Sequence, residues 1–347
     1  MIIDFYKIIP LILISIVIYF LNIKFFGSIY KRADIHQKYS SDFLGNPMGG
    51  YTIFFFVIFF KFYLNYLELF FLFLIFLSGI LSDVKIFNSP AKRLFFQIGV
   101  IFLCISFSEI EIISTRIDFL DYLLMNKYIN IIFTVFCVLI VINGSNFIDG
   151  LNGLVIGYYL IISSILISIN LNIDLHIENY LLINFASVLI ILLTLNFFNK
   201  VFLGDNGSYL IGFLFSIYLI RIHQINADIS PYFIILLLWY PCFENLFSIV
   251  RKKLSKIFAT NPDNSHLHQL FFLFIFKGLN IKNKLLANNL TSLIINIYHL
   301  SIFFIGAQNF DKTKIQLLLI IINLIIYMGL YFFLNRFKKN YNNKTAI

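Results

Sequence analysis

The residues best suited to chemistry lie between 143 and 154, where a polar stretch interrupts two long apolar runs. Asn146, Asp149 and Asn152 recur there at about one helical turn, so their side chains can share one face of a helix. The glycines beside them allow another backbone or a ligand to approach closely. A carboxylate in a bilayer costs about 3 kcal/mol at mid-depth and therefore usually has a partner or a task. A helix cap needs one such residue, so several together favour a binding or catalytic role.

A second acid, Asp205, lies between glycines in the segment 203–208. Two acids from different loops, Asp149 and Asp205, could hold a divalent metal, because Mg²⁺ combines carboxylates with phosphate oxygens and retained waters. Taken alone, the segment is also compatible with an ordinary tight turn. The metal hypothesis therefore depends on the two acids meeting in space.

A third cluster combines an acid with basic residues at a predicted helix end. Asp83 follows Ser82, and Lys85, Lys92 and Arg93 come shortly afterwards. Two readings stay open for this cluster. It could belong to a site, or its basic residues could anchor a helix at the membrane surface.

Two histidines, His266 and His268, lie in the longest and most basic polar segment. On a helix their rings would diverge, so a loop or extended stretch is needed for both to point together. No cysteine or third histidine is close enough to favour zinc, and contact with a phosphate or sugar is the better interpretation. A histidine pair by itself is weak evidence. A fifth cluster, a basic turn after the first apolar run, holds Arg32, His36 and the segment 46–50.

The elements that must position these residues are membrane helices. Hydrophobic residues make up 60% of the 347 and charged residues 12%, against about 45–50% and about 25% in soluble domains. We expect an all-α, polytopic membrane helix bundle that forms one domain over 1–347, with its first helix retained rather than cleaved. The stretches 108–126 and 270–280 could be interfacial. Eleven spans are predicted: 8–26, 51–65, 67–81, 94–107, 128–142, 154–171, 180–198, 209–222, 231–250, 286–306 and 315–334.

The distribution of positive charge orients this bundle. With the N-terminus outside, 19 of the 26 Lys and Arg residues fall on the inner side, as the positive-inside rule requires. We therefore expect a bacterial inner-membrane protein with its C-terminus in the cytoplasm. All the polar clusters then fall on the cytoplasmic side, although they were not used to set the orientation. A shared site at the cytoplasmic membrane surface is the natural inference.

Five stretches resemble, in order, the motifs of the polyprenyl-phosphate N-acetylhexosamine-1-phosphate transferase superfamily: 47–50, 82–83, 146–150, 204–208 and 262–268. That superfamily includes the peptidoglycan translocase and the enzymes that start O-antigen, enterobacterial common antigen and teichoic acid synthesis. The resemblance covers nearly the whole chain. It implies transfer of a hexosamine 1-phosphate from a UDP-N-acetylhexosamine to undecaprenyl phosphate, with release of UMP.

The resemblance also implies roles for the clustered residues. Mg²⁺, with Mn²⁺ as the alternative, is expected at Asp205 and Asn146. Phosphoryl transfer asks mainly for positioning and charge stabilisation, and we expect no nucleic acid partner, while a homodimer stays open. Asp83 is expected to orient or deprotonate a lipid phosphate that is already largely dianionic. The expected catalytic residues are Asp83, Asp149, His266 and His268, and the expected substrate contacts are Lys92, Arg93, Asn152 and Arg251.

Three positions depart from the family pattern. Ser82 stands where relatives usually carry Asp, Asn152 where many carry Asp, and Gln269 where a further His is common. These changes favour the branch that starts surface polysaccharides over the peptidoglycan enzyme, phospho-N-acetylmuramoyl-pentapeptide transferase. An inactive relative stays open because of Ser82. A transporter or flippase is the rival from another class, but transporters place ionisable groups at mid-membrane.

Overall fold

The computed structural model describes residues 47–60, 64–87, 89–172, 179–254 and 265–345. Within these ranges the chain forms helices and no strand, which confirms the predicted all-α class. The helices are α2 (Gly49–Phe60), α3 (Tyr66–Asp83), α4 (Pro90–Ser108), α5 (Asp118–Leu124), α6 (Lys127–Ile148), α7 (Leu154–Asn172), α8 (Asn179–Phe197), α9 (Gly204–Ile225), α10 (Pro231–Leu254), α11 (Leu267–Leu273), the π-helix η1 (Phe274–Gly278), α12 (Lys284–Ala307) and α13 (Thr313–Thr345).

Eight of the described helices are long and apolar enough to cross a membrane: α3, α4, α6, α8, α9, α10, α12 and α13. The shorter apolar helices α2 and α7 also coincide with predicted spans. The predicted span 51–65 overlaps α2, and residues 61–63 of that span lie outside the described residues. The predicted span 8–26 lies outside the described residues. The stretch 108–126 contains the short helix α5, and 270–280 contains the end of α11 and η1.

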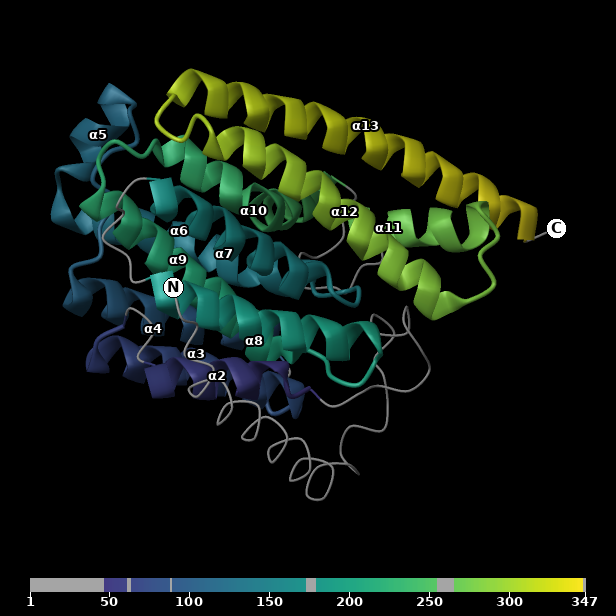
Figure 1. The fold of residues 1–347 in the computed structure, drawn as a ribbon, viewed down its shortest axis with the longest axis horizontal. Coiled ribbons are helices and arrows are strands. Elements are labelled where there is room, and N and C mark those ends of the chain that lie inside the picture. The colour runs from purple at the N-terminus through teal and green to yellow at the C-terminus, as the bar shows by residue number, and fades with distance from the viewer. Residues whose placement is uncertain (1–46, 61–63, 88, 173–178, 255–264, 346–347) are drawn as a thin grey trace.

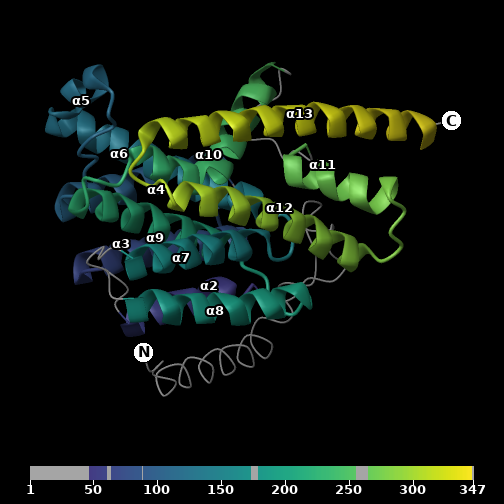
Figure 2. The same cartoon turned by 45° about the horizontal axis from the view of Figure 1, so that its top comes forward.

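Helix α9 forms the centre of the bundle and is the most buried of the eight candidate spans. It packs against α2, α3 and α6, while α7 packs against α8 and α12, and α10 against α6 and α13. Figures 1 and 2 show α13 as a long outer helix that runs toward the C-terminus beside α11. In both views α5 lies at the opposite end of the molecule. The bundle thus has two distinct ends joined by long apolar helices.

Glycines allow the helices around α9 to approach closely. A Cβ built on Gly79 of α3 would lie 2.3 Å from Cα of Asn206, and one on Gly144 of α6 would lie 2.2 Å from the carbonyl oxygen of Pro241. Real Cβ atoms cannot come this near to backbone, so only glycine fits. Gly204 begins α9 with φ of 72°, in the left-handed region that glycine occupies without strain. These contacts bring the C-terminal end of α3 onto the N-terminal end of α9.

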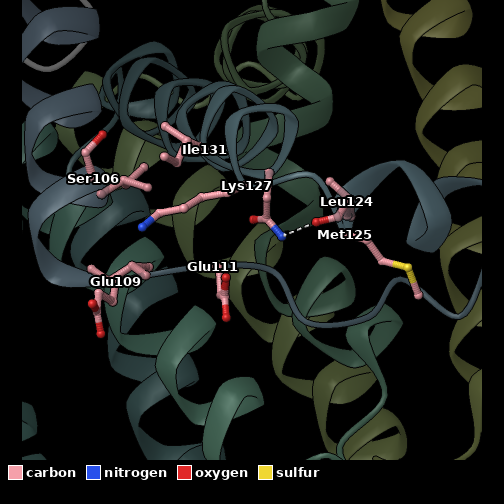
Figure 3. Close-up of a pocket in the computed structure, with 10 residues that line it drawn as sticks. Ser106, Glu109, Glu111, Leu124, Met125, Lys127 and Ile131 are labelled. Atoms are coloured by element: carbon pink, nitrogen blue, oxygen red, sulfur yellow. Dashed lines mark hydrogen bonds between the residues drawn. The ribbon is translucent and has the colours of Figure 1, made fainter.

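A pocket of about 210 Å³ lies at the end of the bundle near α5. Figure 3 shows Lys127 extending toward the side of the pocket formed by Ser106 and Glu109, with Glu111 nearby. Asn130 closes one wall by donating from Nδ2 to the backbone oxygen of Leu124 at 3.2 Å. Since α6 begins at this end and reaches Asn146 only at its other end, the pocket is remote from the polar stretches of the sequence.

Candidate active site

Asp205 is the residue at which three other helices meet. Its Oδ2 accepts from Nη1 of Arg93 at 3.0 Å and from the hydroxyl of Ser82, while its Oδ1 accepts from Nδ2 of Asn146 at 2.7 Å. Arg93 lies in the first turn of α4, which begins with Pro90 at N1, a position that suits proline because its missing N–H has no intrahelical acceptor. Helices α3, α4, α6 and α9 therefore converge on one carboxylate at the site end of the bundle.

The carboxylate of Asp83 caps the N-terminal end of α9. Its Oδ1 accepts from the backbone N–H of Asp205 at 3.0 Å, and its Oδ2 accepts from the backbone N–H of Asn206 at 3.2 Å and from the side-chain amide of Asn206. A helix N-terminus leaves such N–H groups without intrahelical partners and favours negative charge. Asp83 thereby holds α9 in place and positions Asp205. Its predicted role as a base for the lipid phosphate stays a prediction.

Asp149 is the acid of the cluster that lacks support from the protein. It follows the last residue of α6 and is partly exposed. Within the described part of the chain no group hydrogen-bonds its carboxylate. Burial, followed by the charges of Asp205 and Asp83, holds the pKa of Asp149 well above its ordinary value. The three acids are thus close enough to repel one another, and a cation between Asp149 and Asp205 would relieve that repulsion.

The acids fit a hard cation that is completed by a substrate. Among the described residues there is no group of three or more His, Cys, Asp or Glu side chains that could hold a metal alone. Mg²⁺ does not need one, since it is bound by one or two carboxylates together with phosphates and waters. Asp149 offers both oxygens. Asp205 already accepts three hydrogen bonds, and Asn146 donates its amide to Asp205 and to Ser208 at 3.0 Å. Asn146 therefore orients Asp205, and its own oxygen is the atom left for a ligand.

The two predicted imidazoles lie against the end of α6. His266 precedes α11 in an extended conformation, and its ring stacks on that of His268 with centroids 5.7 Å apart. The ring of Phe147 lies 5.4 Å from that of His266, and a Cβ on Gly150 would lie 2.6 Å from Nε2 of His268. His266 is extended as expected, whereas His268 lies in the first turn of α11, and this arrangement brings both imidazoles next to the stretch that contains Asp149.

His268 is fully enclosed. Neither of its ring nitrogens has a hydrogen-bond partner in the described part of the chain. Burial, and then the neighbouring His266, lowers the pKa of His268 to about 3. The ring is therefore neutral at physiological pH, and its nitrogens are available to a ligand or an internal water.

A carboxylate that sequence reasoning missed supports this pair. Glu244 of α10 is completely buried and accepts from Nδ1 of His266 at 2.9 Å and from the hydroxyl of Tyr327 at 2.7 Å. The sequence does contain a signal for Glu244, because an acid inside an apolar span is a candidate functional residue by default. The same signal applies to Glu68, which pairs with Arg221.

The remaining predicted residues contact other parts of the protein. Arg251 donates to the backbone oxygen of Ser265 and, at 3.3 Å, to the hydroxyl of Tyr331. The buried Asn152 donates from its backbone N–H to Asn288 at 2.8 Å and from its side chain to Asn199 at 3.3 Å. These two residues therefore hold segments together rather than join the acids. Lys92 is exposed beside Arg93. Arg32, His36 and the segment 255–264 lie outside the described residues.

Comparison with known proteins identifies the region that contains the acids. Residues 65–223 match the family described as Glycosyl transferase family 4. This region of the chain is therefore similar to glycosyl transferase family 4. It includes Asp83, Asp149 and Asp205, whereas His266 and His268 lie beyond the match.

The chain is also similar to a named bacterial protein. A protein from Bacillus subtilis (strain 168), named "Probable undecaprenyl-phosphate N-acetylglucosaminyl 1-phosphate transferase", is 30% identical over 231 residues, which is 65% of this chain. The chain spans 62% of that relative's length. The inferred resemblance is confirmed, and the family match together with the eight apolar helices of the described chain indicates a multi-pass membrane protein.

Proposed function

We propose that this protein transfers an N-acetylhexosamine 1-phosphate from a UDP-sugar to undecaprenyl phosphate and releases UMP. The observation that carries the proposal is the convergence of Asp83, Asp149, Asp205 and Arg93 at one end of the bundle, with His266 and His268 beside them. The family match and the name of the Bacillus subtilis relative support the same reaction class.

The chemistry follows from the charges of the substrates. Both are anions, so the site must hold two phosphate groups against their repulsion. An oxygen of the lipid phosphate forms a bond to the sugar-bearing phosphorus, and the bond from that phosphorus to the bridging oxygen breaks, so UMP leaves. Arg93 is a cation at the acid cluster, and Asp149 with Asp205 would hold Mg²⁺. The metal, when bound there, would neutralise the diphosphate and stabilise the leaving group.

The location of the site sets the rest of the proposal. We place the chain in the bacterial inner membrane with the acid cluster at the cytoplasmic face, where nucleotide sugars are found, and with the C-terminus on that side. The step would be the first membrane reaction of a surface polysaccharide rather than of peptidoglycan. The substitutions at Ser82, Asn152 and Gln269 relative to the family pattern support this branch.

Replacement of Asp205 by Asn tests the acid cluster. We expect transfer from radiolabelled UDP-GlcNAc to undecaprenyl phosphate in membranes to fall by about 100-fold or more, because the central carboxylate of the site is lost. Asp118→Asn is the control, since Asp118 is exposed on α5 at the other end of the bundle. Full activity in Asp205→Asn would remove Asp205 from the reaction. UMP-stimulated return of sugar to UDP is expected as well, because one phosphoanhydride replaces another.

A further inference from the structure

Glu244 has no exposed surface, although it is an acid on a candidate membrane span. An isolated charge in a low-dielectric interior is costly, so a buried carboxylate is retained where it has partners. Each oxygen of Glu244 has its own donor: Oε1 is bonded to His266 and Oε2 to Tyr327. One of these donors, His266, begins the segment that contacts the end of α6.

The His266 ring is held on three sides. Glu244 lies at Nδ1, the His268 ring stacks on it, and the Phe147 ring packs against it. Because a carboxylate only accepts hydrogen bonds, the proton of this pair lies on Nδ1. The other nitrogen, Nε2, has no partner in the described part of the chain. The His266 side chain is 8% exposed, whereas His268 has no exposed surface.

The accessible nitrogen belongs to a ring beside the acid cluster. Phe147 stands between Asn146, which bonds Asp205, and Asp149. The neighbouring Gly150 leaves just enough room for the His268 ring. A diphosphate held by the acids through a cation would therefore extend along the same end of α6 that His266 contacts.

We propose that Glu244 is a positioning residue that accepts the Nδ1 proton of His266, so that the ring, which carries a proton on both nitrogens when the nucleotide sugar is bound, donates from Nε2 to one of its phosphate oxygens. This rests on the proposed function, because it takes the nucleotide sugar as the ligand. A protonated ring between a carboxylate and a phosphate makes two charge-assisted hydrogen bonds. Tyr327 occupies the second oxygen of Glu244 and keeps that carboxylate from turning away from the ring.

A double-mutant cycle tests the coupling. Glu244→Gln removes the charge but keeps the shape, and His266→Asn removes the ring. We expect Glu244→Gln to lower kcat/KM for UDP-GlcNAc by about 10- to 100-fold, the size of the effect of orienting partners of site histidines. The double variant is expected to lose no more than His266→Asn alone, since the two residues act as one unit. Independent, multiplying losses would overturn the proposal.

Two further variants guard against a general loss of folding. Glu68→Gln is the matched control, because Glu68 is also completely buried on a membrane helix and paired with a cation, Arg221. The loss of kcat/KM caused by Glu68→Gln is expected to multiply with the loss caused by His266→Asn, because the two residues act independently. A double variant that loses no more than His266→Asn alone would count against the proposal. Tyr327→Phe is milder, since it leaves the Glu244–His266 bond. We expect a few-fold loss that disappears in the His266→Asn background.

A spectroscopic measurement separates this proposal from the proposed function. In ¹⁵N-histidine spectra of the purified full chain without substrate, the signal absent from His266→Asn is expected to report a proton on Nδ1. In Glu244→Gln it is expected to shift toward the other tautomer, and an unchanged signal would overturn the positioning role. If the wild-type protein forms no lipid-linked sugar, the proposed function fails while this spectrum still decides the role of Glu244.

Discussion

Asp149 and Asp83 are both acids of the same cluster, but they differ in the hydrogen-bond donors around their carboxylates. Asp83 accepts backbone and side-chain hydrogen bonds from the start of α9, which offset part of the cost of burying its charge beside Asp205. Asp149 has no such donors, and its pKa is raised by burial and then by the charges of Asp205 and Asp83. A raised pKa means that the ionised carboxylate destabilises the folded state. A residue that destabilises the folded state in this way is expected to be one that the function requires.

Asp149→Asn is therefore expected to stabilise the protein while it abolishes activity. The folded protein holds the Asp149 proton more tightly than the unfolded chain, so stability is lost as pH rises from the ordinary pKa of about 4 through the raised value. Melting temperatures of the variant and the wild type should thus agree near pH 4, and the variant should be higher at pH 7.5.

Added Mg²⁺ should narrow the difference in melting temperature between Asp149→Asn and the wild type at pH 7.5, because it stabilises the wild type. Asp121→Asn is the control, because it is expected to change the melting temperature at neutral pH in the opposite direction. Burial alone would raise the pKa of Asp121, but hydrogen bonds from Thr115 and Ser114 lower it. Its loss should therefore destabilise the protein at neutral pH. A lower melting temperature for Asp149→Asn at pH 7.5 would refute the reading of Asp149 as an unsupported charge.

At the scale of elements, the junction of α3 and α9 decides the geometry of the acids. Asp83 and Ser82 end α3, and Asp205 begins α9, so the distance between two helix ends fixes how these side chains meet. Gly79 allows that distance, because a side chain there would collide with the backbone of Asn206. Ser82, which stands where relatives usually carry Asp, still takes part in this junction. Its hydroxyl donates to Asp205 and accepts from Arg93.

Gly79→Ala is expected to lower stability by about 1–3 kcal/mol, as an overpacked core does, and to reduce transfer activity by separating Asp83 from α9. Gly99→Ala is the matched control on another membrane helix, where a Cβ meets nothing within 4 Å. That change should be neutral or stabilising by up to about 1 kcal/mol, because alanine favours helix over glycine. Denaturation in detergent and the transfer assay measure both effects. Equal behaviour of the two variants would contradict the close-packing explanation.

At the scale of the whole molecule, the bundle separates its polar groups between two ends. The described parts of the segments expected inside, near 83, 149, 205 and 266, meet at one end. The opposite end carries α5 and the pocket with Lys127 and Glu109. The proposed function fits this separation, since it takes one substrate from the cytosol and the other from the membrane.

Cysteine labelling tests the orientation of these ends. Two single-cysteine proteins are made from a variant without Cys104, Cys137 and Cys242. Met125→Cys places an exposed thiol at the end near α5, and Lys277→Cys places one at the end with the acid cluster. A membrane-impermeant maleimide is expected to reach position 125 in intact spheroplasts and position 277 only in inverted vesicles. The reverse pattern would place the acid cluster outside and end the proposed use of cytosolic UDP-sugars.

The class of the fold and the identity of the acids could be predicted from the sequence because their signals are local. Apolar runs of about 20 residues define membrane helices whatever they pack against. Asp83, Asp149 and Asp205 were recognisable because each interrupts such a run or lies at its end, and Asp149 and Asp205 also adjoin glycines. Glu244 was missed although an acid inside an apolar span is itself a signal, because no polar motif surrounds it.

The sequence by itself determined that this is a helical membrane protein, which family it resembles and which polar stretches matter. Only the tertiary structure decided that Asp83 caps α9, that Asn152 and Arg251 bond to other segments, and that Glu244 holds His266. The physical reason is distance along the chain. Hydropathy and spacing act over a helical turn or a span, whereas a side-chain hydrogen bond joins residues up to more than a hundred positions apart, and helix packing alone selects its partners.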